Sequence, residues 1–158
     1  MKQSARGYTL IELMIVLAVL GVLAAMAIPM ADIAAQRSKE AELKRSLWEI
    51  RDALDAYKAA RASGAIPGDS SAPLYPPSLD TLVEAIPDAR PAAKGQVLRF
   101  LRRVPRDPFA DNLLPASETW GLRSYLSEAS KPANGADVYD VYSKSSQRAL
   151  NGTALKDW

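Results

Sequence analysis

The sequence predicts an α+β fold in which one long N-terminal helix packs on a small antiparallel β-sheet domain. An uncharged apolar run from Leu13 to Ala31 leads into a polar run rich in helix formers, interrupted only by Gly21 and Pro29. Two later segments, 120–126 and 138–143, are rich in aromatic and β-branched residues, which is typical of strands. Ten of the eleven prolines lie after residue 66, so the part beyond the helix is expected to be rich in loops.

The first half of the predicted helix, residues 8–31, is long and apolar enough to cross a membrane. Its 19 uncharged residues from Leu13 to Ala31 match the roughly 20 that a helix needs to span a bilayer. The segment before it, residues 1–7, carries Lys2 and Arg6 and no acid. By the positive-inside rule, this end stays in the cytoplasm and the rest of the chain is translocated.

The second half, residues 32–63, predicts an amphipathic helix that continues from the membrane-spanning half. Apolar residues recur at intervals of four, three, four and three, which marks one helix face: Leu43, Leu47, Ile50, Leu54 and Tyr57. Charged residues occupy the opposite side: Lys44, Arg45, Glu49, Arg51, Asp52 and Lys58. We interpret the stripe as a contact with the following domain, because a coiled coil needs three or four heptads and only about two are present.

The two halves together predict one helix over residues 9–62, about 80 Å long. Pro29 should kink it or melt it locally, because proline removes a backbone hydrogen bond. Gly64 and Pro67 end the helical pattern.

The remaining residues, 64–158, predict one loop-rich globular domain. Short helices are expected over Leu79–Ile86, with Ser78 as the N-cap, and over Gln96–Arg103. The strands Trp120–Leu126 and Val138–Ser143 should form a hairpin with a long loop. The tail carries the turn signal Asn151-Gly152 and ends in Trp158, which is expected to dock on the domain.

Composition excludes several classes of function. The chain has no histidine and no cysteine, which removes the commonest general base, thiol chemistry and disulfides. Its 20 basic and 18 acidic residues give a net charge of only +2, which argues against nucleic acid as a partner. We interpret Arg99, Arg102 and Arg103 as a solvent-exposed face of the domain. The carboxylate pairs Asp52/Asp55 and Asp137/Asp140 are interpreted as structural, so the chain is not predicted to be an enzyme.

Glu12 lies near the start of the apolar segment. A carboxylate inside a bilayer costs about 2.5–3.5 kcal/mol on insertion scales and therefore needs a partner. If the chain is cut after Gly7, a new α-amine appears at Tyr8, four residues before Glu12. Between stacked copies, the amine of one copy can meet the carboxylate of the next, which indicates self-assembly into a homo-oligomer. The alternative is an interfacial acid that reaches the lipid headgroups.

This N-terminus resembles those of type IV pilins and of the pseudopilins of type II secretion. The matching residues are Gly7, Tyr8, the Thr9–Leu13 block and Pro29, although the family usually has Phe at the position of Tyr8. The resemblance implies that residues 1–7 are a leader peptide, which a prepilin peptidase removes by cleaving between Gly7 and Tyr8. The same enzyme would then methylate the Tyr8 amine. It also implies that Glu12 and Pro29 act in assembly.

A looser resemblance to pseudopilins similar to the major, G-type subunit of type II secretion runs to the C-terminus. It is carried by four segments in the family's order: 75–79, 99–109, 120–125 and 140–143. It implies a pilin-like fold, anchorage in the bacterial inner membrane with the domain in the periplasm, and assembly into a helical fibre that helps to export folded proteins. The implied partners are other pseudopilins and a secretion platform protein.

Pseudopilins of that type bind calcium in the loop after the last strands, so the resemblance also implies a candidate calcium site in this loop. The candidate side chains here are Ser143, Asn151 and Asp157, and Asp157 is the only acid from Ser143 to the end. Calcium takes six to eight oxygen ligands and usually several carboxylates. We therefore expect no cofactor, with calcium as the weakly supported exception.

Three alternatives to the secretion subunit stay open at this point. The chain can be interpreted as a minor type IV pilin or as a competence pseudopilin. The sequences of these proteins differ little from that of a secretion subunit. It can also be read as a soluble periplasmic protein, released by signal peptidase at Ala25-Met26-Ala27. A membrane-anchored enzyme is the least supported, because histidine and cysteine are absent.

Overall fold

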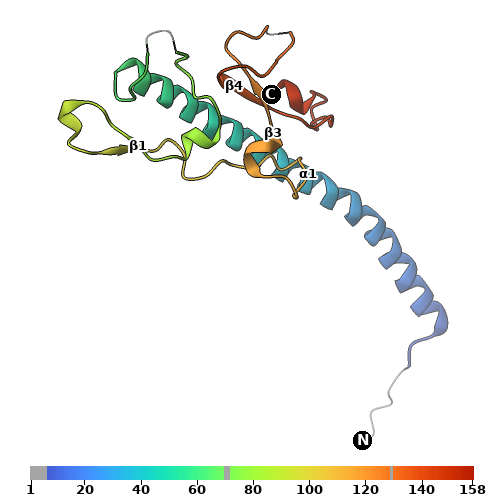
Figure 1. Ribbon diagram of the computed structural model, residues 1–158. Coiled ribbons are helices and arrows are strands. Elements are labelled where there is room, and N and C mark those ends of the chain that lie inside the picture. The colour runs from blue at the N-terminus through green and yellow to red at the C-terminus, as the bar shows by residue number, and fades with distance from the viewer. Residues whose placement is uncertain (1–6, 70–71, 129) are drawn as a thin grey trace, which may run out of the picture. The chain divides into compact units, whose positions relative to one another are not determined.

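A computed structural model describes residues 7–69, 72–128 and 130–158, with backbone only at residues 26–29 (Figure 1). Helix α1 (Leu10–Ala62) comes first and is followed by short elements. In chain order these are η1 (Asp80–Leu82), β1 (Ile86–Pro87), η2 (Pro91–Ala93), β2 (Val97–Leu98), η3 (Ala116–Thr119), β3 (Trp120–Arg123), β4 (Asp140–Ser143) and η4 (Leu155–Asp157). The chain divides into two compact units, residues 1–38 and 39–158.

Helix α1 confirms the predicted long helix over residues 9–62, with its start displaced by one residue to Leu10. The helix continues through Pro29 without interruption, so local melting, one of the two effects expected of Pro29, is wrong, and a kink stays a prediction. Proline removes only its own N–H donor from the helical ladder. The turns on either side keep their hydrogen bonds and hold the backbone helical.

The predicted apolar stripe of α1 is the core of the second unit. Leu43, Leu47, Ile50, Leu54 and Tyr57 are each no more than 7% exposed. Burying a side chain of this size contributes about 1.5–3 kcal/mol. The stripe is therefore a contact with the following domain, as its spacing predicted.

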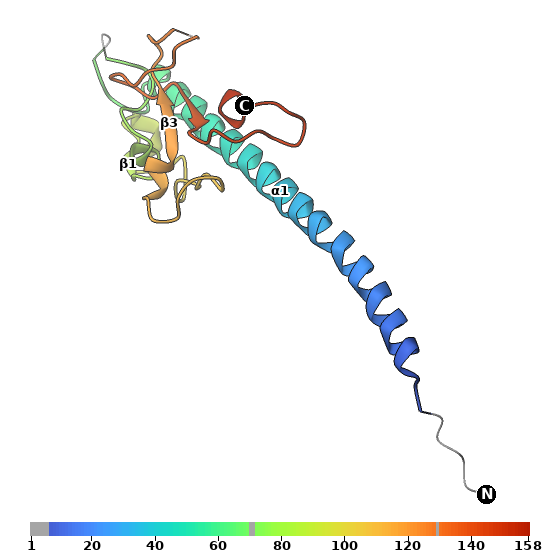
Figure 2. The same cartoon turned by 90° about the vertical axis from the view of Figure 1, so that its right-hand side faces the viewer.

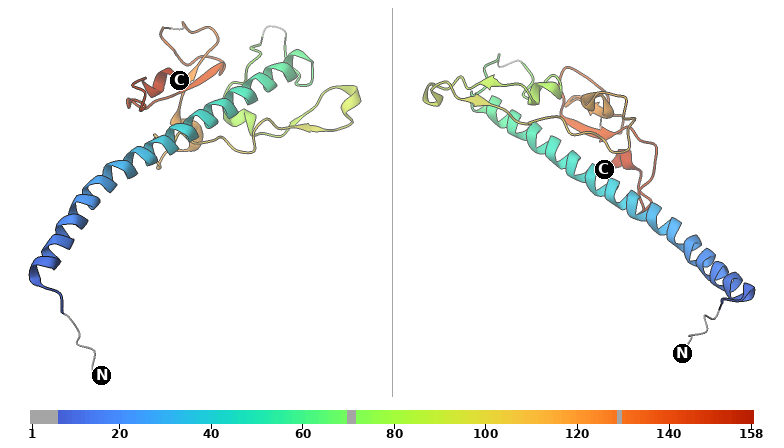
Figure 3. Two further views of the ribbon diagram at one scale, coloured as in Figure 1. Left: turned by 180° about the vertical axis from the view of Figure 1, so that it is seen from behind. Right: turned by 90° about the horizontal axis from the view of Figure 1, so that it is seen from below.

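The rest of the unit covers this stripe with short strands and loops. Figures 2 and 3 show these segments lying along the part of α1 that follows Lys39. Most of the other buried side chains come from them: Leu79, Leu82, Leu101, Val104, Trp120, Val138, Val141 and Leu155. Trp120 is 1% exposed, and its Nε1 donates to the carbonyl of Pro105 at 2.8 Å, so its polar atom is satisfied.

Strands β3 and β4 form the predicted antiparallel pair, with Trp120 opposite Ser143 and Arg123 opposite Asp140. Gly121 lies opposite Tyr142, whose ring occupies the space that a Cβ at residue 121 would fill. This cross-strand contact explains why a glycine follows the buried tryptophan. The two strands are linked through residues 124–139, as the sequence predicted.

The helix predicted over Gln96–Arg103 is wrong. Val97 and Leu98 instead form β2, which pairs antiparallel with β1 through a turn at Lys94 and Gly95, both at positive φ. The amides of Phe100 and Leu101 both donate to the carbonyl of Leu82. These long-range bonds replace the local bonds that a helix would need.

The helix predicted over Leu79–Ile86 is reduced to the single turn η1. Ser78 still acts near its start, because its Oγ accepts from the Thr81 amide at 3.4 Å. Pro87 lies in β1, and an isolated segment this short does not offset the cost of helix nucleation.

Asp107 links the loop before η3 to β4 from a fully buried position, at 1% exposure. Its carboxylate accepts from the Phe109 amide at 2.8 Å and from Ser143 Oγ at 2.6 Å. Its own amide donates to Thr119 Oγ1 at 3.2 Å. Asp107 lies in one of the segments that resemble the family, but this role was not predicted from the sequence.

We predict that Asp107→Ala destabilises the domain strongly, because it leaves the buried hydroxyl of Ser143 and the part-buried amide of Phe109 without their acceptor. An unsatisfied buried group costs about 1–3 kcal/mol. Asp111→Ala is the matched control, since that exposed carboxylate also accepts one amide hydrogen, from Leu113. Urea unfolding of the detergent-solubilised chain measures both, and equal midpoints for the two variants would contradict the role of Asp107.

Candidate functional site

The start of α1 is held by a reciprocal pair of hydrogen bonds between Thr9 and Glu12. The Glu12 amide donates to Thr9 Oγ1 at 3.3 Å, and the Thr9 amide donates to Glu12 Oε2 at 3.5 Å. The Thr9 carbonyl accepts the first helical bond, from Leu13 at 3.2 Å. This arrangement is a capping box, in which an N-cap threonine and a glutamate three residues later satisfy each other's amides.

The capping box gives Glu12 a local partner before any neighbouring molecule is present. Its carboxylate also lies at the end of the helix where the backbone dipole favours negative charge. A carboxylate offers about four acceptor positions, so this bond leaves capacity for a further donor. The Thr-x-x-Glu pattern signals such a cap in a sequence. The cap was nevertheless not predicted from Thr9 and Glu12.

Gly7 and Tyr8 precede the helix and are accessible. Both residues are exposed, Tyr8 at 76%, and neither belongs to a helix or strand. A Cβ built at Gly7 meets no atom within 4 Å. The predicted cleavage bond therefore lies in open chain just ahead of the N-cap; the leader residues 1–6 lie outside the described residues.

The first unit presents apolar side chains to its surroundings on all sides of the helix. From Leu10 to Leu23, the large apolar residues are between 48% and 78% exposed. Helix α1 is long and apolar enough to cross a membrane by length and composition. A helix that is apolar all round needs lipid or other apolar helices to cover it. The side chain of Pro29, the other predicted assembly residue, lies outside the described part.

In the second unit, Arg51 clamps the C-terminal tail. Its Nε donates to Asp140 Oδ1 at 2.8 Å, and its Nη2 donates to the carbonyls of Trp158 at 2.9 Å and Val141 at 3.3 Å. Lys44 Nζ lies 4.4 Å from the centre of the Trp158 ring. Trp158 thus docks as predicted, whereas Lys44 and Arg51, assigned to a charged face away from the core, bind the tail.

The three candidate calcium ligands have different surroundings. Ser143 is fully buried and donates to Asp107. Asn151 Oδ1 accepts from the amide and the hydroxyl of Thr153, at 3.0 and 2.7 Å, and Asp157 is exposed. Across residues 7–69, 72–128 and 130–158, no group of three acidic side chains is placed to hold a metal.

The two carboxylate pairs, Asp137/Asp140 and Asp52/Asp55, differ in their surroundings. Asp137 is buried and accepts from Ser124 Oγ and from the Tyr125 amide, while Asp140 is paired with Arg51. The two aspartates of the helix pair, residues 52 and 55, are both exposed.

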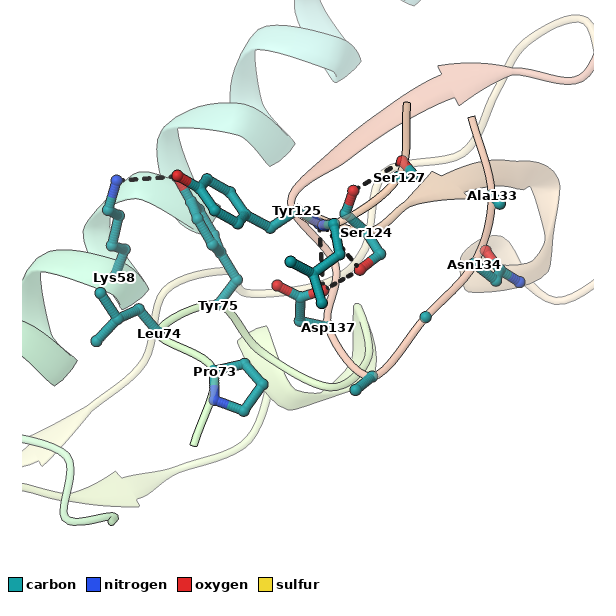
Figure 4. Close-up of a pocket in the computed structure, with 13 residues that line it drawn as sticks. Lys58, Pro73, Leu74, Tyr75, Ser124, Tyr125, Ser127, Ala133, Asn134 and Asp137 are labelled. Atoms are coloured by element: carbon teal, nitrogen blue, oxygen red, sulfur yellow. Dashed lines mark hydrogen bonds between the residues drawn. The ribbon is translucent and has the colours of Figure 1, made fainter. Parts of the chain in front are cut away.

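A groove of about 610 Å³ opens beside the end of α1 (Figure 4). Tyr75 and Tyr125 stack in it with ring centres 6.2 Å apart, and Tyr139 meets both edge-on. Lys58 Nζ donates to Tyr75 Oη at 3.2 Å, and this hydrogen bond raises the pKa of Lys58 above its usual value of 10.5. Lys58 therefore stays protonated at neutral pH and is unsuited to act as a base or nucleophile.

Comparison with known proteins finds a matching family at the N-terminus and similar curated proteins. Residues 2–28 match the family described as "Prokaryotic N-terminal methylation motif". The chain is 32% identical over 111 residues to the type II secretion system core protein G of Klebsiella pneumoniae, covering 70% of this chain and 73% of that protein. It is 39% identical over 62 residues to the fimbrial protein EcpB of Eikenella corrodens, covering 39% and 37%. No solved structure matches significantly.

We predict that Arg51→Ala releases the C-terminal tail, because three acceptors lose one rigid guanidinium. Hydrogen–deuterium exchange of the full chain should show faster exchange in residues 155–158. Arg51→Lys should not restore protection, since an ammonium group lacks the planar fork that reaches several acceptors.

Arg45→Ala is the control for the loss of an exposed arginine from the same helix. If Arg51→Ala and Arg45→Ala give the same exchange in the tail as the unmodified chain, the clamp has no such role.

Proposed function

The chain belongs to the family of type II secretion core protein G, the pseudopilins, and from this premise we propose that Glu12 and the amine of a cleaved Tyr8 direct its assembly. The protein is a structural subunit of a type II secretion pseudopilus. The observation that carries the proposal is the capping box, because it holds the carboxylate of Glu12 at the very end of an uncovered apolar helix.

The first step is removal of the leader by a prepilin peptidase, which cuts between Gly7 and Tyr8. The accessible, non-helical backbone at this bond supports the assignment, and so does the methylation-motif match over residues 2–28. Cleavage creates a positively charged amine at Tyr8, and the same enzyme then methylates it. In this account the amine and the capped carboxylate lie within one helical turn of each other.

The second step joins one copy to the next. Glu12 accepts a bond from the Thr9 amide and retains acceptor capacity, so the Tyr8 amine of a neighbouring copy can bind it without breaking the cap. An ion pair formed in an apolar environment is strong, because little solvent screens it. The pair would therefore select an incoming subunit and fix its axial register, with Pro29 as the second assembly residue.

The apolar helices then bundle at the centre of a helical fibre. This covers the side chains of residues 10–23, which the isolated chain leaves exposed. Before assembly the same surface anchors the subunit in the inner membrane as a single span, with residues 64–158 in the periplasm. We propose a prepilin peptidase, other pseudopilins and a secretion platform protein as the partners of these steps.

The alternatives are less well supported. The match to core protein G covers 70% of the chain, so it extends well beyond the motif that pilins and competence pseudopilins share. A signal-peptidase cut after Ala27 would fall inside helix α1. An enzymatic role gains no support from the groove, where the basic group is a protonated lysine bound to tyrosine.

We predict that Gly7→Val blocks removal of the leader. The structure has free space for a side chain at Gly7, so the variant should insert and fold normally and fail only in the peptidase. Mass measurement of the membrane-extracted chain distinguishes the uncut from the cut form. A processed Gly7→Val chain that has lost residues 1–7 would show that this bond is not the peptidase's recognition site.

We also predict that Glu12→Ala and Glu12→Leu are cleaved normally but do not form fibres, because the amine of the neighbouring copy has no carboxylate to bind. Glu42→Ala is the control, since it removes an exposed glutamate from the same helix outside the apolar part. Electron microscopy of sheared fibres, beside an immunoblot for cleavage, measures both steps. Fibres of normal number from either Glu12 variant would refute the role of Glu12.

A further inference from the structure

The segment after β4, residues 144–158, folds back on itself as a tight hairpin. Gly152, at positive φ, donates to the Ala149 carbonyl at 2.8 Å and closes the turn. The Ala149 amide donates to the Thr153 carbonyl at 2.9 Å, and the Leu155 amide donates to the Gln147 carbonyl at 3.1 Å. Three backbone carbonyls of this hairpin therefore already accept protein hydrogen bonds.

Three side-chain oxygens of the hairpin, those of Ser145, Asn151 and Thr153, also form hydrogen bonds. Thr153 Oγ1 donates to Asn151 Oδ1 and accepts from Trp158 Nε1, both at 2.7 Å. Ser145 Oγ accepts from the Gln147 amide at 3.2 Å. The bonds among Asn151, Thr153 and Trp158 form a chain that ties the turn to Trp158.

The charges of the hairpin are predominantly positive. Residues 144–158 contain Lys144, Arg148 and Lys156 against the single acid Asp157. Arg148 Nη1 donates to the Gly152 carbonyl at 2.8 Å, across the turn. A cation of the protein itself thus binds the kind of backbone oxygen that a metal ion would use in such a loop.

Two further contacts fix the hairpin on the domain. Ala149 is 5% exposed, and Leu155 is completely buried in the core. The Leu150 amide donates to Glu40 Oε1 of helix α1 at 2.8 Å. Packing and helix contacts therefore hold the hairpin in place, in addition to its internal bonds.

We propose that this hairpin is closed by its own hydrogen bonds and by Arg148, in place of the calcium ion that its family resemblance implies. Calcium takes six to eight oxygens and favours several carboxylates, whereas the oxygens here accept from protein donors and the local charge is positive. The periplasmic domain is then able to fold and keep its tail docked without calcium. This proposal goes beyond the assembly function and does not depend on Glu12.

The direct test is the effect of calcium on the full chain in detergent. Thermal unfolding and hydrogen–deuterium exchange of residues 144–158 are measured with calcium chloride and with the chelator EGTA. Because a ligand that binds the folded state raises its stability, a calcium site would raise the unfolding midpoint and slow exchange in the hairpin. We expect no difference between the two buffers, and a calcium-dependent rise in either quantity overturns the proposal.

Two variants test what closes the hairpin instead. Thr153→Val removes the hydroxyl at nearly constant volume, and Arg148→Ala removes the guanidinium. Each should speed exchange at the Ala149 and Gly152 amides by roughly tenfold, the effect of losing about one hydrogen bond, and calcium should not reverse it. Lys156→Ala, which removes an exposed positive charge from the same segment, should leave exchange unchanged.

Unchanged exchange in both Thr153→Val and Arg148→Ala would show that these residues do not close the hairpin. Recovery of either variant by calcium would also overturn the proposal. If a variant does not fold, the comparison of calcium with EGTA on the unmodified chain still decides whether the metal is needed.

Discussion

The structure depends on one carboxylate at the head of an apolar helix. Glu12 is costly to place in lipid without a partner, and it is bound within the chain by the Thr9 amide. This capping box satisfies two helix-terminal amides and gives the carboxylate one of the donors that it can accept. It also fixes the carboxylate at the point where cleavage after Gly7 would release an amine. The same local bond therefore starts the helix and orients the group proposed to join one copy to the next.

Helix α1 carries two different patterns of apolar residues along its length. Its first part is apolar on every side, whereas its second part buries the single stripe Leu43–Tyr57 and uses flanking charged residues to hold the domain's tail. The strands that the structure describes in residues 72–128 and 130–158 are two to four residues long, so the helix supplies much of the domain's core. The same helix therefore supplies the core stripe of the domain and the exposed apolar segment proposed to act in assembly.

The sequence predicted the features that depend on a local pattern of residues. These are the long helix, its buried stripe and the segments that form β3 and β4, each of which is recognised from the spacing or type of residues close together in the chain. The predicted helix at 96–103 failed because its amides bond to distant carbonyls such as that of Leu82. The roles of Asp107, Arg51 and Glu40 were missed for a related reason, since their contacts cross 36 to 110 residues of chain. The Thr9–Glu12 cap was not predicted, although its Thr-x-x-Glu pattern is local and present in the sequence.

The central claim is that an amine at Tyr8 meets the carboxylate of Glu12, and it is tested most directly by the first residue of the mature protein. The unmodified chain, isolated from fibres or membranes of its native host, can be analysed by N-terminal sequencing and intact mass. The account predicts a chain that begins at Tyr8 and carries one added methyl group. A mature chain that begins at any other residue would place the amine elsewhere and contradict the account.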